Sequence, residues 1–137
     1  MKYIVIIGGG RLGSHMADVF SEQGDSVVII DNNAESFKNL GENFSGFTVE
    51  ADGRELEVLE HAKMSKADAV LCVTNDDNTN LMIAEIATEI YKIKKVIARI
   101  EEPENRKIAE KLGLKVVCPL ELSAGELERI LGGDGSK

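Results

Sequence analysis

The chain has 137 residues, which suits one ordinary domain and leaves no room for a separate catalytic domain. Its formal net charge of −8 at pH 7 argues against a nucleic-acid backbone or an anionic membrane surface as a direct partner. No apolar run approaches the ~18 residues that a membrane-spanning helix needs, so we expect no direct membrane insertion.

The start of the chain and its two cysteines favour a cytoplasmic location. No signal peptide pattern follows Met1. Cys72 and Cys118 each lie in an apolar stretch, and no second Cys or His stands at metal-ligand spacing. We therefore expect two small core residues in a reducing compartment, and no bound metal.

Apolar segments typical of strands alternate with helix-forming segments along the chain. We expect strands near residues 2–7, 26–31, 47–50, 69–74, 95–100 and 115–118. We expect helices near residues 11–23, 34–42, 54–61, 78–91, 104–111 and 120–131. This alternation predicts a Rossmann-like α/β fold, a doubly wound parallel six-stranded sheet in the order 3-2-1-4-5-6 with helices on both faces. One domain would span residues 1–131, followed by a flexible tail at 132–137.

The first fourteen residues carry the most informative motif. An apolar run at residues 3–7 leads into a glycine turn, Gly8-Gly9-Gly10-Arg11-Leu12-Gly13, and a helix-forming stretch follows. A second apolar run, at residues 26–30, ends at Asp31. A GxGxxG pattern is weak by itself, but here strand, helix and acid all agree with a dinucleotide-binding βαβ unit. The alternative is a glycine turn that only connects two elements.

Each residue type in this unit has a physical role. Gly8 permits a tight turn, Gly10 lacks a Cβ that would hold a phosphate away, and Gly13 lets helix and strand pack closely. The N-terminus of the helix favours a phosphate at this place. Asp31 would accept hydrogen bonds from ribose hydroxyls, and Asn32 beside it brings no cation for a 2′-phosphate. NADP is therefore disfavoured.

Polar residues also follow the later strands, at the edge of the sheet where ligands bind in this fold. After the third strand, Asp52 would approach an adenine edge or cap the next helix, and Gly53 would allow a left-handed turn. After the fourth, Thr74 and Asn75 would face the crevice.

The same loop and the fifth strand leave two questions open. In the loop, Asp77 or Asn78 would cap the long helix that follows. Arg99 ends the fifth strand among apolar neighbours, where a buried cation needs an anion. A phosphate in the crevice and a structural carboxylate are both candidate partners for Arg99.

Taken together, these residues resemble the KTN domain, the N-terminal lobe of RCK domains in regulatory subunits of Trk- and Ktr-type potassium uptake systems. The matching residues are 8–13, 31, 51–53, 74–80 and 96–99. The resemblance implies a regulatory subunit that binds NAD(H) or an adenine nucleotide (ATP, ADP or AMP) without turning it over. It implies a cytoplasmic location at the inner face of the cell membrane, where the subunit gates a membrane potassium-translocating subunit.

The resemblance also implies roles for individual residues. The implied ligand-binding set is Gly8, Gly9, Gly10, Arg11, Leu12, Gly13, Asp31, Asn32, Asp52, Gly53, Thr74, Asn75, Asp76 and Arg99. In this set the glycine turn would hold the phosphates, Asp31 the ribose, and residues 52–53 the adenine. Residues 74, 75 and 99 would take the far end of the crevice, and Arg11 would sense a terminal phosphate across a dimer.

The chain departs from such subunits in two respects. Most of them continue into a smaller C-terminal RCK lobe, which we do not expect within these 137 residues. Some relatives carry a metal-contacting Glu directly after a proline that corresponds to Pro119, where this chain has Leu120. A bound divalent metal is therefore not expected.

Assembly and two other functions complete the predictions. Apolar residues on more than one face of the helix near 78–91, and along the last helix, predict contact with another subunit, and the resemblance implies a homodimer or a larger ring. The alternative is a doubly covered helix in a monomer. An NAD-dependent oxidoreductase cofactor domain is the rival function, but we find neither a Tyr-x-x-x-Lys motif nor a His–Asp pairing signal. A redox or nucleotide sensor for another partner would have the same crevice.

Overall fold

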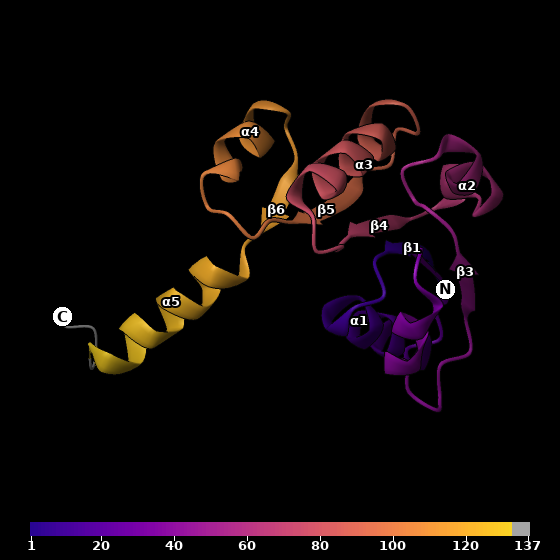
Figure 1. Ribbon diagram of the computed structural model, residues 1–137, viewed down its shortest axis with the longest axis horizontal. Helices are drawn as coiled ribbons and strands as arrows, with labels where there is room; N and C mark the ends of the chain where they lie inside the picture. The colour runs from indigo at the N-terminus through magenta and orange to yellow at the C-terminus, as the bar shows by residue number, and fades with distance from the viewer. Residues whose placement is uncertain (133–137) are drawn as a thin grey trace.

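The computed structural model describes residues 1–132 and shows one six-stranded sheet with helices on both faces (Figure 1). The strands are β1 (Tyr3–Ile7), β2 (Ser26–Asp31), β3 (Phe47–Glu50), β4 (Ala69–Cys72), β5 (Lys95–Arg99) and β6 (Lys115–Val117). All recorded pairings are parallel, and the order is β3-β2-β1-β4-β5-β6. The predicted fold class and strand order are confirmed. The tail predicted for 132–137 lies outside the described residues, apart from Gly132.

Residues 1–132 contain five α-helices and two short 3₁₀ helices, and all but the last α-helix lie between strands. The α-helices are α1 (Arg11–Glu22), α2 (Leu56–His61), α3 (Asp77–Glu89), α4 (Asn105–Lys111) and α5 (Pro119–Leu131). The 3₁₀ helices are η1 (Ala34–Asn39) and η2 (Met64–Lys66).

The α-helix predicted at residues 34–42 was wrong in type and length. The segment is the 3₁₀ helix η1, which Asn33 caps by accepting a hydrogen bond from the backbone of Glu35. The chain is already extended at Leu40, and the Gly41 N–H donates to the carboxylate of Asp18 on α1. This tertiary contact uses a backbone donor that a continuing helix would need.

The core has two parts, one on each face of the sheet. The larger part lies beneath α2, α3 and α4, and the smaller lies beneath α1 and η1 (Figure 1). Val5 on β1 and Ile29 on β2 are fully buried, on opposite sides of the sheet. Strands covered on both faces need apolar residues at every position, which explains the continuous apolar runs in the sequence.

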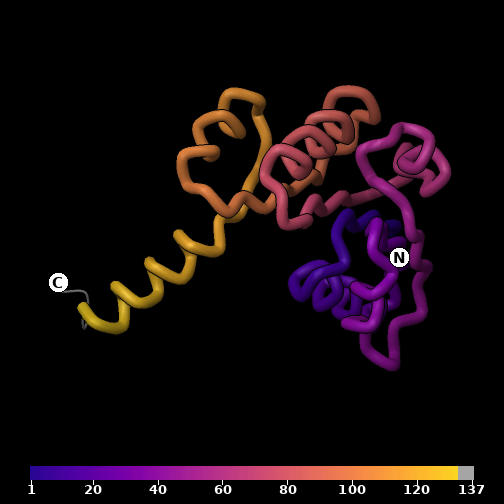
Figure 2. Tube along the Cα trace, in the orientation of Figure 1, coloured from indigo at the N-terminus to yellow at the C-terminus, as the bar shows by residue number. Residues whose placement is uncertain are grey.

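Helix α5 extends away from the body of the domain (Figures 1 and 2). None of its residues is buried. Its exposed large apolar residues are Leu120, Leu122, Leu127, Ile130 and Leu131. No helix within residues 1–132 is long and apolar enough to cross a bilayer.

Two helical glycines should respond oppositely to alanine. At Gly13 in α1, a Cβ would lie 1.9 Å from the carbonyl oxygen of Gly8, whereas at Gly125 in α5 it would meet nothing within 4 Å. We expect Gly13→Ala to lower the free energy of unfolding by about 3 kcal/mol through overpacking. Gly125→Ala should raise it by about 0.5–1 kcal/mol through helix propensity. Urea denaturation followed by circular dichroism measures both, and equal effects would contradict the packing argument.

Candidate functional site

A crevice of about 610 Å³ opens at the carboxyl ends of the central strands. Its volume is in the range of ligand pockets. Eleven of the predicted site residues line it: Gly8, Gly10, Arg11, Asp31, Asn32, Asp52, Gly53, Thr74, Asn75, Asp76 and Arg99. The remaining three, Gly9, Leu12 and Gly13, are not part of its lining. Leu12 instead packs against the smaller part of the core.

The glycine turn brings backbone groups to the wall of the crevice. Gly8 has a φ of +117°, and a Cβ there would lie 2.7 Å from the backbone of Val73. Gly10 precedes α1, and a Cβ there would meet no atom within 4 Å. No side chain caps α1, and its first turn holds no acidic residue. The first amides of α1 therefore have neither an intrahelical partner nor a side-chain cap, which suits an anion.

Asp31 is held firmly at the end of β2. One carboxylate oxygen accepts the Gly9 N–H at 2.7 Å, and the other accepts the Asn33 N–H at 2.8 Å. Gly9 thus positions Asp31 rather than lining the crevice. A carboxylate oxygen accepts more than one hydrogen bond, so Asp31 retains acceptor capacity toward the crevice.

Asp52 has a different role from the helix cap considered for it. Residue Glu55 precedes α2, and no side chain caps that helix. Asp52 instead accepts hydrogen bonds from the backbone and the guanidinium of Arg54, with Nη2 at 2.7 Å. These hydrogen bonds from Arg54 hold the pKa of Asp52 below its ordinary value. Gly53 is buried beside them, where a Cβ would lie 2.7 Å from Ile7. The left-handed turn predicted at Gly53 was wrong, because its φ is not positive and close packing against Ile7 is what leaves no room for a side chain.

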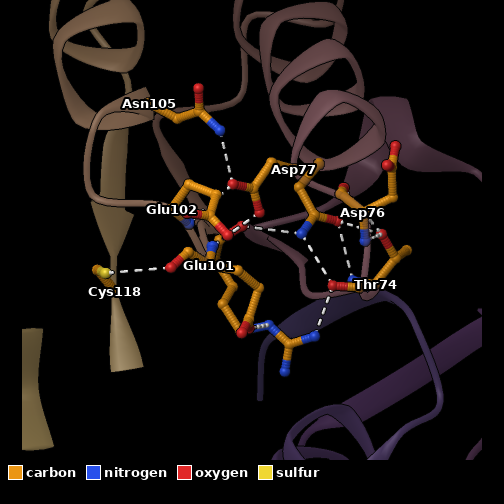
Figure 3. Close-up of polar contacts among 9 residues, drawn as sticks. Thr74, Asp76, Asp77, Glu101, Glu102, Asn105 and Cys118 are labelled. Carbon is orange, nitrogen blue, oxygen red and sulfur yellow. Dashed lines mark hydrogen bonds and ion pairs between the residues drawn. The ribbon is translucent and has the colours of Figure 1, made fainter. Parts of the chain in front are cut away.

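Two acidic residues, Asp76 and Asp77, stand at the start of α3 and have different roles. Asp76 is the cap, and its carboxylate accepts hydrogen bonds from the N–H and the hydroxyl of Thr79. Asp77 accepts the backbone N–H groups of Glu101 and Glu102 (Figure 3). The prediction of a cap at Asp77 or Asn78 was therefore wrong by one residue. The tertiary contact with the loop after β5 occupies Asp77.

A buried asparagine joins the ends of β4 and β5. Asn80 is 1% exposed, and its side-chain oxygen accepts the N–H and the hydroxyl of Thr74. Its amide donates to the carbonyl oxygens of Thr74 and Arg99. The floor of the crevice between these strands is thus fixed by four hydrogen bonds to one side chain.

The Arg99 side chain lies at the far end of the crevice and is 17% exposed. Its Nη2 donates to the carbonyl oxygen of Thr74 at 2.6 Å. Its Nε lies 3.4 Å from a carboxylate oxygen of Glu101. The structural carboxylate considered from the sequence is therefore present, and the guanidinium also faces the crevice.

The sequence model of the TrkA-N domain matches residues 4–119. The chain belongs to the TrkA-N domain family. The match covers all of the sheet except Tyr3 and confirms the resemblance inferred from the glycine turn and the four later segments.

Curated relatives of this TrkA-N domain are potassium uptake proteins. The Trk system potassium uptake protein TrkA of Streptomyces coelicolor is 33% identical over 135 residues, covering 98% of this chain and 60% of the relative. A TrkA homologue of Methanothermobacter thermautotrophicus is 32% identical over 130 residues, covering 94% of this chain and 60% of the relative. The chain thus spans about 60% of the length of these relatives.

Solved structures share the fold of this TrkA-N domain. The RCK domain of GsuK has a TM-score of 0.81 at 23% identity, covering 98% of this chain and 29% of that one. The Shewanella denitrificans Kef C-terminal domain, in an AMP-bound form, has a TM-score of 0.81 at 20% identity, with coverage of 98% and 82%. The GsuK channel bound to NAD has a TM-score of 0.71 at 18% identity, with coverage of 96% and 22%.

Glu121, two residues after Pro119, has a defined environment in this TrkA-N domain. Glu121 accepts hydrogen bonds from the guanidinium of Arg106, at 2.5 Å from Nη2. Within residues 1–132, no group of three or more His, Cys, Asp or Glu residues is placed to hold a metal ion. Both cysteines are buried, and burial raises the pKa of the Cys72 thiol to about 12.

Sequence reasoning assigned no role to two residues that shape the site of this TrkA-N domain. Arg54 lines the crevice and pairs with Asp52. Asn80 is the buried link described above. The signal for Asn80 was present, because an amide at the fourth position of an otherwise apolar helix face requires buried partners. Arg54 gave no such signal, since an exposed arginine is the ordinary expectation at a helix start.

The Asp77 carboxylate should make the free energy of unfolding depend on pH in the acid range. Burial disfavours its charged form, but the hydrogen bonds from Glu101, Glu102 and Asn105 outweigh burial and hold its pKa below 3.8. The stabilisation is therefore present above about pH 3.8 and is lost as pH falls through the lower folded-state pKa. We expect Asp77→Asn to cost about 1 kcal/mol at pH 7, with the gap from wild type closing toward pH 3.

Urea denaturation across this pH range measures the effect. Glu128→Gln is the control, because the Glu128 side chain makes no recorded hydrogen bond or ion pair within the described residues. A constant gap between Asp77→Asn and wild type from pH 7 to pH 3 would contradict the assignment.

Proposed function

We propose that this TrkA-N domain is the nucleotide-binding part of a cytoplasmic regulatory subunit of a Trk- or Ktr-type potassium uptake system. In this proposal it binds NAD(H) or an adenine nucleotide and gates a membrane potassium-translocating subunit through the bound ligand. One observation carries the proposal: the crevice joins uncapped helix amides, a fixed ribose-type acid and three arginines in a single cavity. The names of the curated relatives support the potassium system.

The crevice suggests how an adenine nucleotide would lie in it. The phosphates would contact the first amides of α1 beside Gly10, where the helix dipole adds favourable electrostatics. Asp31 would accept the ribose hydroxyls, with Asn32 beside it. The adenine would lie toward Asp52 and Gly53. The AMP-bound Kef domain and the NAD-bound GsuK channel have related folds, which supports this class of ligand.

The same residues favour NAD over NADP. A 2′-phosphate would be placed against the Asp31 carboxylate, which repels it. The two residues that follow, Asn32 and Asn33, carry no positive charge. Lys38 on η1, the nearest lysine along the chain, is paired with Glu35 at 2.9 Å. The ligand is held without chemical change in this proposal, so the domain acts as a sensor rather than as an enzyme.

A calorimetric titration with NAD⁺, NADH, AMP, ADP and ATP tests nucleotide binding. We expect Asp31→Ala to weaken the binding of every ligand by roughly tenfold or more, because each ligand contains the ribose that Asp31 would bind. Arg11 is exposed and forms no ion pair within residues 1–132. Arg11→Ala should therefore mainly reduce the differences in binding affinity between ligands that carry different numbers of phosphates.

Arg129→Ala on α5 is the matched control, since it removes the same charge far along the chain from the crevice. Equal weakening of all ligands by Arg11→Ala would argue against phosphate sensing. Chromatography of the ligands after incubation, alone and with a panel of carbonyl compounds, completes the test. Oxidation of NADH would favour the oxidoreductase alternative, and consumption of AMP, ADP or ATP would contradict the proposal that the ligand is held without chemical change.

We further propose that α5 joins copies of the chain in a homodimer or a larger ring. Its apolar side chains are 58–84% exposed, and a helix with no buried residue gains stability from a partner. Helix α3 contributes less to this surface, since Leu81, Ile83 and Ala84 are buried against the sheet while Met82 and Ile90 remain exposed.

Sedimentation of the purified chain tests the assembly. We expect wild type to form a dimer or larger species, and Leu127→Glu to shift it toward monomer, because a buried carboxylate at the contact is costly. Phe47→Glu is the control, since Phe47 is 68% exposed on β3 and outside α5. A wild-type monomer at all concentrations would contradict this part of the proposal.

A further inference from the structure

The guanidinium of Arg99 is shared between two environments. One side of it faces the crevice, since Arg99 is among the lining residues. Its Nε is buried and forms no hydrogen bond with any described residue, although a Glu101 oxygen lies 3.4 Å away. Glu101 is not part of the crevice lining. Arg99 is therefore a largely buried cation whose neighbouring anion lies off the crevice.

Glu101 is fixed at its backbone and free at its carboxylate. Its N–H donates to Asp77 at the start of α3 at 2.7 Å (Figure 3). Its side chain is 51% exposed, and within residues 1–132 the only recorded partner of its carboxylate is Arg99. The backbone contact keeps Glu101 beside Arg99, while the half-exposed carboxylate can return to water at small cost.

We propose that Glu101 competes with a nucleotide phosphate for Arg99 and thereby sets how the site discriminates nucleotides by phosphate number. The inference rests on the proposed nucleotide function. A guanidinium binds a phosphate through paired, charge-assisted hydrogen bonds, which are stronger than its loose contact with Glu101. A phosphate that reaches the far end of the crevice therefore replaces Glu101, but it does so against the repulsion of a nearby carboxylate.

The competition acts only on ligands that extend far enough. In this proposal a monophosphate binds at the first amides of α1, whereas the longer triphosphate extends along the same crevice, which Arg99 also lines. Glu101 therefore opposes the longer ligand selectively. The negative charge of Glu101 moves the preference of the site toward nucleotides with fewer phosphates.

Calorimetry of AMP, ADP and ATP, with EDTA present so that no divalent cation screens the phosphates, tests the competition. We expect Glu101→Gln to tighten the binding of ATP about fivefold and that of AMP less than twofold, because the variant removes the carboxylate that competes for Arg99 and repels the phosphates. Glu102→Gln is the matched control. It removes the same charge one residue along, from a side chain with no recorded contact to Arg99, and should change neither ligand by more than twofold.

A double variant separates competition at Arg99 from a general charge effect. In an Arg99→Gln background, Glu101→Gln should tighten ATP binding clearly less than it does in the wild-type background, because the competition for the shared cation is gone and only the direct repulsion by Glu101 remains. Equal tightening by Glu101→Gln and Glu102→Gln, or no tightening by Glu101→Gln, would overturn the inference and leave nucleotide binding standing. A wild-type chain that binds none of the three ligands would instead overturn the proposed function, and the inference with it.

Discussion

The close contact between α1 and the turn that precedes it governs the arrangement of the crevice. No side chain separates Gly13 from Gly8, because even a Cβ would come within 1.9 Å of the Gly8 oxygen. The helix therefore starts directly at the carboxyl end of β1. Its first amides lie beside the crevice rather than a turn away from it, and the dipole of a twelve-residue helix acts on whatever binds there.

A second constraint fixes the opposite side of the crevice. Asn80 connects the ends of β4 and β5, and Asp77 connects the start of α3 to the loop after β5. Both side chains have their hydrogen bonds satisfied, mainly by backbone groups and also by the side chains of Thr74 and Asn105, so the wall that carries Arg99 is ordered without a ligand. Such preorganisation reduces the conformational entropy that binding must remove.

The charged side chains that line the crevice differ in how firmly existing contacts hold them. Asp52 and Arg54 are locked together by direct hydrogen bonds, and Asp31 is locked by backbone N–H groups. Arg11 is free of ion pairs among the described residues, and Arg99 has a neutral partner in the Thr74 carbonyl oxygen and only a loose contact with the anion Glu101. The two arginines are thus the cations that a phosphorylated ligand can recruit with little loss of existing contacts.

The sequence by itself determined the sheet, its strand order and the place of the crevice. Continuous apolar runs mark strands buried on both faces, and the glycine turn with Asp31 marks the end of the sheet where ligands bind. These features depend on local patterns, so they can be found without knowing which segments meet. Eleven of the fourteen residues assigned to the site do line the crevice, because the ends of parallel strands meet at one edge.

Tertiary structure alone decided the partners of the polar side chains. The 3₁₀ form of η1, the cap at Asp76 and the pairing of Arg99 with Glu101 each depend on a contact between segments or on a one-residue choice within a loop. Gly9 and Leu12 belong to the motif, yet one positions Asp31 and the other packs in the core. Residue type and spacing specify which groups can bond, whereas the fold specifies which of them are close enough to do so.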